Sequence, residues 1–407
     1  MKSKIITLFI AVIFLTSILV FFSDKIYIIS NIIKDVGIGF ASAILSHNFK
    51  TVDVIKSRFD DTNSKVKIML VPGHEPDFGG AEYKKLKERD MNVELGQYLK
   101  QILELDSHYE VFVTRDTKDW NPIISSYYKN NWNEIVEWVR ASKKDFSSLV
   151  SNGIVTKKYS TVTHNEAPQD VAVRLYGLTK WANENDIDIV IHIHFNDNRR
   201  RNVSAPGKYS GFSMYVPDGQ YGNSTTTKAI ADSLFKRLSK YNAVSDLPGE
   251  TSGIIDEPEL IAIGSNNTSD APSLLIEYSY IYEPQFENIE TRSMAIKDLA
   301  YHTYLGLQDF FGVSSDYGIY DTVVLPYKWQ NPVSLNKMSS SEVFVLQTAL
   351  MFGGVYPPNG KTKNECPRTG KIGPCTLKSL EIFQKNNGIT GEDGVIGEKT
   401  IKTLKFI

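Results

Sequence analysis

The chain contains little cysteine and carries almost no net charge, and each shortage excludes a class of function. Only two of its 407 residues are cysteines, Cys366 and Cys375, and neither lies near other metal-ligating residues in the sequence. A thiolate metal site is therefore not expected. Lysine and arginine (45) nearly balance aspartate and glutamate (47). The chain thus lacks the basic excess typical of nucleic-acid binding, and we expect no nucleic-acid partner.

The N-terminus carries a hydrophobic run without charge at residues 5–22, directly after the sequence Met-Lys-Ser-Lys. This run is at the short limit for a membrane span and is long for a signal-peptide core. No small-x-small cleavage site follows it, which favours an uncleaved membrane anchor at residues 1–27 over a removed signal. The preceding lysines remain in the cytoplasm by the positive-inside preference. We therefore expect a stalk at residues 28–64 and an exported remainder.

Between residues 65 and 313 apolar strands alternate with amphipathic helices, which predicts an α/β domain with a mainly parallel sheet flanked by helices. The expected strands cover residues 66–71, 109–114, 187–194, 211–216 and 273–277. The expected helices cover residues 90–104, 168–185, 225–240 and 291–311. An excursion at residues 118–167, with a helix near 132–146, is too long for an ordinary connection. It is either a surface insertion that packs its own aromatic residues or a lid or substrate-binding arm.

Four residues of the types that serve zinc hydrolysis stand where apolar segments of this domain begin or end. They are His74, Glu88, His194 and Glu277. Because the carboxyl ends of parallel strands meet at one edge of a sheet, we expect these side chains to lie close together. Catalytic zinc takes three imidazole or carboxylate ligands and works with a nearby carboxylate that moves protons. We therefore predict His74, Glu88 and His194 as zinc ligands and Glu277 as the general base.

Two of these assignments compete with a neighbour of the same type. His192 and His194 alternate with isoleucines and so face the same side of their strand, but His194 is nearer the edge. Glu88 precedes its helix, whereas Glu94 lies one and a half turns inside it, where it is harder to aim at the sheet edge. We choose His194 and Glu88. We expect His192 to support the site or to fill the core, and Glu94 to be solvated.

The same region contains a series of short sequences in a fixed order. They are Val-Pro-Gly-His at 71–74, Gly-Gly-Ala at 79–81, Glu-Arg-Asp-Met-Asn-Val at 88–93, Val-Phe-Val-Thr-Arg at 111–115, Arg174 with Ala-Asn at 182–183, His-Phe-Asn at 194–196 and Pro-Ser-Leu-Leu-Ile-Glu at 272–277. In this order they resemble the zinc-dependent N-acetylmuramoyl-L-alanine amidases of the amidase 3 family. The resemblance implies that His74, Glu88 and His194 bind zinc and that Glu277 is the catalytic carboxylate. It also implies cleavage of peptidoglycan between N-acetylmuramic acid and L-alanine.

Three positions depart from the pattern of that family. Val71 replaces an aspartate, Glu-Pro at 75–76 replaces Gly-Gly, and His192 replaces a serine. These changes affect the surroundings of the ligands and the wall of the cleft, so they bear on rate and substrate preference more than on the type of reaction. Arg115 and Arg174 are candidates for support of the site or for carboxylate binding, and structural ion pairs are the simpler alternative.

The C-terminal part contains an internal repeat after an expected linker at residues 314–335. Residues 370–380 and 394–404 share the pattern Gly-x-Ile-Gly-x-x-Thr followed by apolar residues. The repeat predicts a small, duplicated all-α domain over residues 336–407, and it resembles peptidoglycan-binding domain 1. A helical bundle without a ligand is the alternative. Because the chain is predicted to be exported, a disulfide between its two cysteines is plausible, with two free thiols as the alternative.

Together these features predict an extracytoplasmic zinc amidase of the bacterial cell wall, anchored in the membrane or secreted, whose partner is peptidoglycan. A protein activator remains an open question at this level. Two rival functions stay open as well. A peptidoglycan peptidase would use the same metal chemistry on a different amide bond, and a non-catalytic wall-binding protein would have lost its activity.

Overall fold

A six-stranded sheet forms the centre of the computed structural model, which describes residues 48–162, 164, 166–197, 201–313, 321–329, 333–392 and 395–404. The strands, in the sheet order β4-β1-β5-β8-β6-β7, are β4 (Tyr109–Val113), β1 (Val66–Pro72), β5 (Ile189–Asn196), β8 (Ser273–Tyr280), β6 (Ser213–Pro217) and β7 (Ile254–Glu257). The first four run parallel to one another, whereas β6 is antiparallel to β8 and β7 is parallel to β6. The mainly parallel sheet predicted from the sequence is confirmed.

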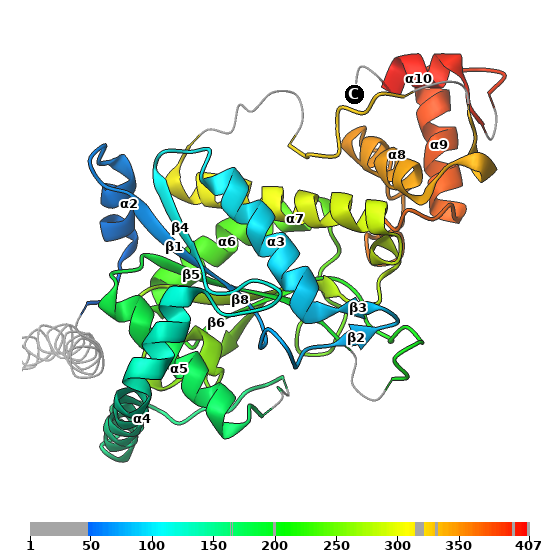
Figure 1. Ribbon diagram of the computed structural model, residues 1–407. Coiled ribbons are helices and arrows are strands. Elements are labelled where there is room, and N and C mark those ends of the chain that lie inside the picture. Colours follow the sequence, from blue (N-terminus) through cyan, green and yellow to red (C-terminus); the bar gives the residue numbers. More distant parts are fainter. Residues whose placement is uncertain are drawn as a thin grey trace, which may run out of the picture.

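Helices cover both faces of the sheet (Figure 1). On one face lie α3 (Glu88–Leu103), α6 (Ser224–Tyr241) and α7 (Ile289–Phe311). On the other face lie α4 (Pro122–Ser151), α5 (Gln169–Glu184) and the short 3-10 helices η1 (Ile261–Ile263) and η2 (Ser265–Asn267). The strands are apolar on both sides because both faces are buried, as is typical of parallel sheets. Ile189, Ile191 and Ile193 of β5 belong to the core under α3, α6 and α7, and Val190 belongs to the opposite core.

Residues 52–60 form helix α2 (Val52–Asp60), which packs against the domain. Ile55 and Phe59, one helical turn apart, are buried, and the ring of Phe59 stacks on Phe311 with 4.1 Å between the ring centroids. Arg58 pairs with the buried Asp188 at 2.8 Å. The prediction of a stalk over residues 28–64 is therefore wrong in its described part, because an amphipathic helix of this kind buries its apolar side.

The predicted anchor at residues 1–27 lies outside the described residues. Within the part of the chain that the structure describes, no helix is both long enough and apolar enough to cross a membrane.

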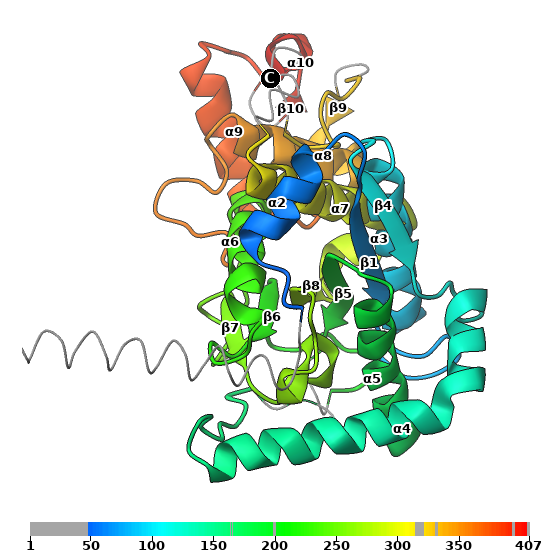
Figure 2. The ribbon, with the colours of Figure 1, turned by 90° about the vertical axis from the view of Figure 1, so that its left-hand side faces the viewer.

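The insertion predicted at residues 118–167 consists of a long helix and a returning segment. Helix α4 has 30 residues, begins with Pro122 after the side-chain cap of Asn121, and extends beyond the helix expected near residues 132–146. Figure 2 shows it running along one end of the molecule. Its buried residues Ile124 and Ile135 belong to the same core cluster as residues of α5, so the helix is packed on its neighbour.

The segment after α4, which we call the strap (residues 152–162, 164 and 166–168), is fastened to β6 and β7 and to the loop between β6 and α6. Lys158 pairs with Asp218 at 2.8 Å, and His164 lies 3.2 Å from Glu257. Val162 is buried in an apolar cluster with residues of β6, β7 and β8. These contacts hold the strap along the same sheet face that α5 covers.

The C-terminal domain contains α8 (Ser340–Phe352), α9 (Pro374–Asn386) and α10 (Glu398–Leu404), with a short ladder between β9 (Val333–Ser334) and β10 (Val395–Ile396). The repeat seen in the sequence has a structural counterpart. The amide nitrogen of Gln347 donates to the hydroxyl of Thr376 at 3.0 Å, and that of Gln384 donates to Thr400 at 3.0 Å. Each buried glutamine thus bonds the threonine in the first turn of the following helix.

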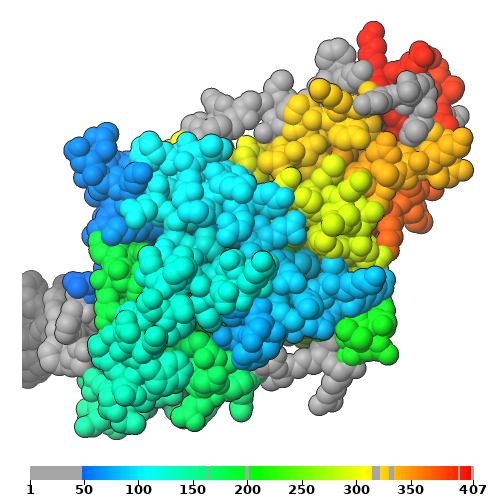
Figure 3. Space-filling view, viewed as in Figure 1, coloured from blue at the N-terminus to red at the C-terminus, as the bar shows by residue number. Residues whose placement is uncertain are grey.

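This domain is docked on α7 of the α/β domain (Figure 3). Arg368 donates to Asp298 of α7 at 2.9 Å, and both side chains are buried. A disulfide joins Cys366 and Cys375 and closes the loop that carries Arg368. Of the two states that the sequence left open for the cysteines, the structure has the disulfide. The remaining short elements are β2 (Glu82–Tyr83), β3 (Leu86–Lys87), η3 (Pro284–Phe286) and η4 (Leu335–Lys337).

Candidate metal centre and active site

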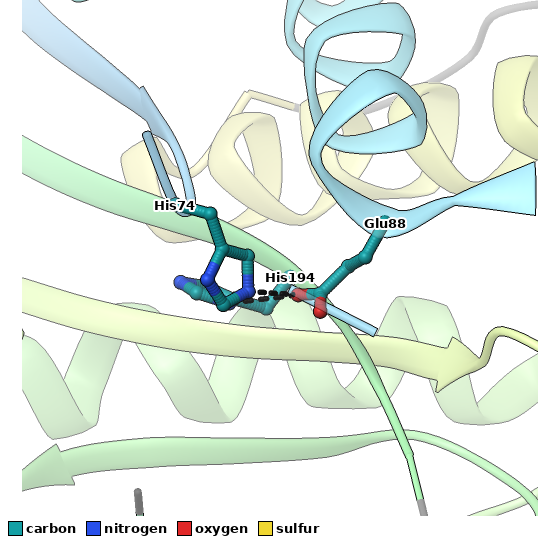
Figure 4. A group of neighbouring side chains, drawn as sticks. All are labelled: His74, Glu88 and His194. Atoms are coloured by element: carbon teal, nitrogen blue, oxygen red, sulfur yellow. Dashed lines mark hydrogen bonds and ion pairs between the residues drawn. The ribbon is translucent and has the colours of Figure 1, made fainter. Parts of the chain in front are cut away.

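The structure brings together the three residues predicted to bind metal. One potential ligand atom from each of His74, Glu88 and His194 lies within 4.8 Å of the others, the only such group of three or more among the described residues. Glu88 Oε1 is 2.8 Å from His74 Nε2 and 3.0 Å from His194 Nδ1. Figure 4 shows the two imidazole rings and the carboxylate converging from β1, α3 and β5.

The loop after β1 is folded tightly around His74. His74 has a φ of 69°, a left-handed conformation that is uncommon for residues other than glycine and that often occurs at functional sites. Gly80 has a φ of 83°, and a β-carbon there would lie 2.8 Å from His74 Cδ2. The Gly-Gly-Ala sequence at residues 79–81 is thus explained by the close approach of the backbone to this ring.

Glu88 is aimed at the group by the first turn of α3, of which it is the first residue. Its Oε2 accepts a hydrogen bond from the backbone nitrogen of Ala81 at 2.7 Å, and its Oε1 accepts one from the backbone nitrogen of Phe195 at 3.3 Å. Burial acts to raise the pKa of Glu88, but the neighbouring imidazoles outweigh burial and hold the pKa well below its usual range. Glu88 is therefore a carboxylate.

These properties fit a divalent metal such as zinc. Burial lowers the pKa of His194, which keeps its imidazole neutral as a ligand requires. His74 Nε2 is buried and forms no hydrogen bond within the described residues, although it lies 2.8 Å from the Glu88 carboxylate. Two imidazoles, one of them with a nitrogen that lacks a hydrogen bond, and one carboxylate form a donor set that matches catalytic zinc sites.

Glu277 lies beside this group on the adjacent strand. In the parallel ladder between β5 and β8 it is the register partner of His194. Its Oε2 is buried and accepts no hydrogen bond within the described part of the chain. Burial, together with the negative charges of Glu88 and Glu250, raises the pKa of Glu277 well above its usual value. A carboxyl group with these properties can hold a proton near neutral pH.

Two residues that the sequence left as alternatives take other positions. His192 is 3% exposed on the same face of β5 as His194, and burial lowers its pKa to about 3. It is therefore a neutral residue beneath the group. Glu94 lies 4.0 Å from Arg292 of α7 and is not part of the group.

Arg115 supports the loop that carries His74. Its guanidinium donates to the backbone oxygens of Pro72 at 3.0 Å and Arg89 at 3.0 Å, and also to that of Gly73. Burial lowers the pKa of Arg115 to about 10, so it remains protonated at neutral pH. Of the two roles that the sequence left open, the structure assigns Arg115 that of a backbone clamp.

Arg174 acts on the other side of His74. It pairs with Glu75, the next residue along the chain, at 2.8 Å and with Asp170 at 2.6 Å. The side chain of Glu75 is buried, so the pair closes the site toward α5. Arg174 is thus a structural ion-pair partner, which was the simpler of the two readings.

Sequence reasoning did not identify a hydrogen-bond network around Glu250, which lies in the loop before β7. Its carboxylate accepts hydrogen bonds from Tyr215 at 2.5 Å, Ser245 at 2.5 Å and Asn196 at 3.2 Å. Only Asn196 had a sequence signal, as the last residue of the His-Phe-Asn motif. The loop that brings Glu250 to this place has no periodic pattern of its own.

Comparison with known proteins gives one family match. The family model described as N-acetylmuramoyl-L-alanine amidase, amidase 3, matches residues 68–309, which is more than half of the chain. No curated protein sequence matches the chain.

Solved structures of amidases also resemble the chain. One is the CwlD amidase from Clostridioides difficile in complex with the GerS lipoprotein, at 16% identity over 61% of this chain and 100% of that chain, with a TM-score of 0.38. Ami1 from Mycobacterium smegmatis matches at 12% identity over 61% of this chain and 99% of that chain, with a TM-score of 0.40. The catalytic domain of CwlV from Bacillus (Paenibacillus) polymyxa var. colistinus matches at 15% identity over 61% and 99%, with a TM-score of 0.37. On the extent of the family match, the chain belongs to the amidase 3 family of N-acetylmuramoyl-L-alanine amidases.

Proposed function

We propose that the protein is a zinc-dependent, extracytoplasmic amidase that cuts peptidoglycan between the lactyl group of N-acetylmuramic acid and L-alanine. The family match gives the type of enzyme. The observation that carries the zinc dependence is the convergence of His74, Glu88 and His194, with Glu277 on the neighbouring strand. In this proposal the first three side chains hold the zinc ion and Glu277 is the catalytic carboxylate.

The chemistry requires an attack by water on the amide carbonyl and a proton for the leaving amine. His74, Glu88 and His194 would hold a zinc ion here, which would supply a lowered pKa for the attacking water and polarisation of the substrate carbonyl. Glu277 accepts the proton of the attacking water at its free Oε2, which the raised pKa of this carboxyl group favours. As the C–N bond breaks, Glu277 returns that proton to the amine nitrogen of L-alanine. Arg115 keeps the loop of His74 in place throughout.

The proposed location rests on the two ends of the chain. The uncharged run at residues 5–22, after two lysines, supports export with the N-terminus as an anchor or signal. The disulfide between Cys366 and Cys375 is of a kind that persists outside the cytoplasm. We assign the C-terminal domain a peptidoglycan-binding role, in which its attachment to the wall raises the local concentration of substrate.

The test is digestion of purified cell wall by the full-length protein. An amidase releases stem peptides whose N-terminal residue is L-alanine, whereas a peptidase leaves this residue attached to the sugar. We expect one zinc ion per chain by elemental analysis, and a Glu277→Gln variant that keeps its zinc but loses activity by about 10²–10⁴-fold. Glu110→Gln, on the exposed side of β4, is the matched control and should keep full activity.

The outcomes separate the proposed function from its rivals. A wild-type protein without zinc and without released peptide would identify a wall-binding protein instead. Released peptides that lack an N-terminal L-alanine would identify a peptidase. Full activity of Glu277→Gln would remove this residue from the mechanism and leave the assignment of the enzyme intact.

A further inference from the structure

The carboxylate of Glu250 is buried beside the active-site strands and is held only by uncharged donors. The residue is 1% exposed. Its Oε1 accepts hydrogen bonds from the hydroxyl of Tyr215 and the amide of Asn196, and its Oε2 accepts them from the hydroxyl of Ser245 and, at 3.4 Å, from the same amide. A buried carboxylate is costly unless it is well hydrogen-bonded, so this arrangement requires every one of these donors in place.

The donors tie together three neighbouring strands. Asn196 is the last residue of β5, and Tyr215 lies in β6. Ser245 also lies 3.4 Å from the hydroxyl of Tyr280, the last residue of β8. One carboxylate therefore connects β5, β8 and β6 at the edge of the sheet where His194 and Glu277 stand.

At this edge the pairing of β5 with β8 shifts its register, and a hydrogen-bond network can hold such a shift in place. His194 pairs with Glu277 in the regular ladder, but two residues later the register shifts and Asn196 pairs with Tyr280. Between these two pairs β5 advances by two residues and β8 by three, so the extra residue lies in β8. Such a bulge bends its strand and re-aims the side chains next to it. The amide of Asn196 donates to both oxygens of Glu250, at 3.2 and 3.4 Å, and so fixes the strand on the far side of the bulge.

We propose that Glu250 is a positioning residue for the hydrolysis, which through Asn196 fixes β5 opposite the bulge of β8 and thereby the aim of His194 relative to Glu277. The inference rests on the proposed function, because it takes His194 as a metal ligand and Glu277 as the proton carrier. Glu250 forms no hydrogen bond with either of these residues, so its positioning effect passes through the strand. Its charge, which helps to raise the pKa of Glu277, is a separate effect that the Tyr215→Phe variant leaves in place. Its effect should appear in metal binding and in the chemical step, not in substrate affinity.

The test compares the full-length wild type with Glu250→Gln. Glutamine has nearly the same shape, but its amide group places donors against the amide of Asn196. We expect zinc affinity, measured by competition with a chromophoric chelator, to fall about 10-fold or more, as for other residues that orient metal ligands. We expect kcat on soluble muropeptides to fall by about 10-fold or more while KM changes by less than about twofold, because misplaced catalytic groups slow the chemical step.

Glu392→Gln in the C-terminal domain is the matched control. Glu392 also accepts three hydrogen bonds, from the backbone nitrogens of Lys399 and Thr400 and from the hydroxyl of Thr400. This variant should change stability without changing zinc affinity or kcat. If Glu250→Gln fails to fold, Tyr215→Phe removes one donor and keeps the carboxylate, and it should lower kcat and zinc affinity by a smaller factor with KM unchanged.

A double-mutant cycle with Asn196→Ala tests the route of the effect. If Glu250 acts through Asn196, the double variant should have the same kcat as Asn196→Ala alone, because the second change removes an interaction that is already lost. Additive effects of the two changes would overturn the proposed route. A folded Glu250→Gln or Tyr215→Phe variant with wild-type kcat and zinc affinity would overturn the inference. In that case the proposed function would still stand if the wild-type protein binds zinc and has amidase activity.

Discussion

Replacing Gly73 with alanine should weaken metal binding at least about 100-fold while leaving the protein folded. A β-carbon at this position would lie 2.1 Å from Cε1 and 2.2 Å from Nε2 of the His194 ring. Ordinary contact between such atoms begins at 3.4 Å. The imidazole must therefore move by about 1.3 Å (3.4 minus 2.1), whereas zinc–ligand distances tolerate changes of only about 0.2 Å.

The size of the effect follows from the loss of one ligand out of three. Changes to residues that merely orient a metal ligand cost about 10–100-fold in affinity, so displacement of the ligand itself should cost at least about 100-fold. This factor corresponds to about 2.8 kcal/mol of binding free energy. The backbone nitrogen of Gly73 donates to Ile193 at 2.9 Å, and an alanine keeps this bond. The φ of Gly73 lies outside the left-handed region, so the backbone itself accepts alanine.

The assay is thermal unfolding of the full-length protein with and without saturating zinc, together with zinc titration against a chelator. A metal that binds only the native state raises the unfolding temperature. We expect this rise in the wild type and a much smaller one in Gly73→Ala, with similar unfolding temperatures of the two metal-free proteins. Gly219→Ala is the control, because no heavy atom lies within 4 Å of its β-carbon. Wild-type zinc affinity in a folded Gly73→Ala protein would refute the reasoning.

Three further predictions concern the surroundings of the site and the docking of the domains. Arg115→Ala removes the hydrogen bonds that the buried guanidinium donates to the backbone oxygens of Pro72, Gly73 and Arg89. Hydrogen bonds with a charged partner contribute about 1.5–3 kcal/mol each, so the free energy of unfolding in urea should fall by several kcal/mol; a loss below about 1 kcal/mol would contradict the clamp role. Asp298→Asn should destabilise the protein at neutral pH, because burial raises the pKa of Asp298 but Arg368 outweighs it and holds the pKa below the ordinary 3.8. A carboxyl group whose pKa is lowered by folding stabilises the protein above pH 3.8, and this stabilisation is lost as the pH falls toward the pKa of the folded state. The difference in unfolding temperature between Asp298→Asn and the wild type should therefore shrink below about pH 4. A difference that widens would contradict the prediction. Glu257→Gln removes the carboxylate that binds the strap, so trypsin should cut the strap faster while global unfolding changes little; equal cleavage rates would mean that other contacts hold it.

The candidate site could be predicted from the sequence because its residues stand at the ends of elements. In a parallel sheet the position of a residue along its strand determines which edge it reaches, so His74 and His194 could be placed together without knowledge of the packing. Glu88 could be placed because it begins the helix that follows the first strand. The choice of Glu88 over Glu94 depended on the same geometry, and the structure places Glu88 in the group.

The network around Glu250 could not be predicted in this way. Its partners, Asn196, Ser245 and Tyr215, lie 54, 5 and 35 residues away along the chain. They meet only because β6 joins β8 in the antiparallel direction. All five residues of β6 are buried, so the strand shows no alternation that could reveal its direction or its neighbours.

Helix α2 was missed for a different reason. Its nine residues include only two that are buried, Ile55 and Phe59, which is a weak periodic signal in a short segment. The polar residues that follow it in the sequence favoured a stalk. What holds the helix in place is the stacking of Phe59 on Phe311 and the pairing of Arg58 with Asp188, and both partners lie far along the chain.

The three departures from the family pattern change which charged groups surround the site, because Val71 lacks the carboxylate of the family's aspartate and Glu75 brings a carboxylate that the family's glycine lacks. Val71 is buried in an apolar cluster, where an aspartate would need a partner. Glu75 adds a negative charge after His74, but Arg174 pairs with it at 2.8 Å and compensates it within the chain. His192 adds an ionisable group beneath His194, yet its pKa of about 3 keeps it neutral at physiological pH, and a bound cation nearby would lower that pKa further. The substitutions therefore alter both the charged groups and the shape of the walls around the ligands, and differences in turnover from other family members should arise from these two changes.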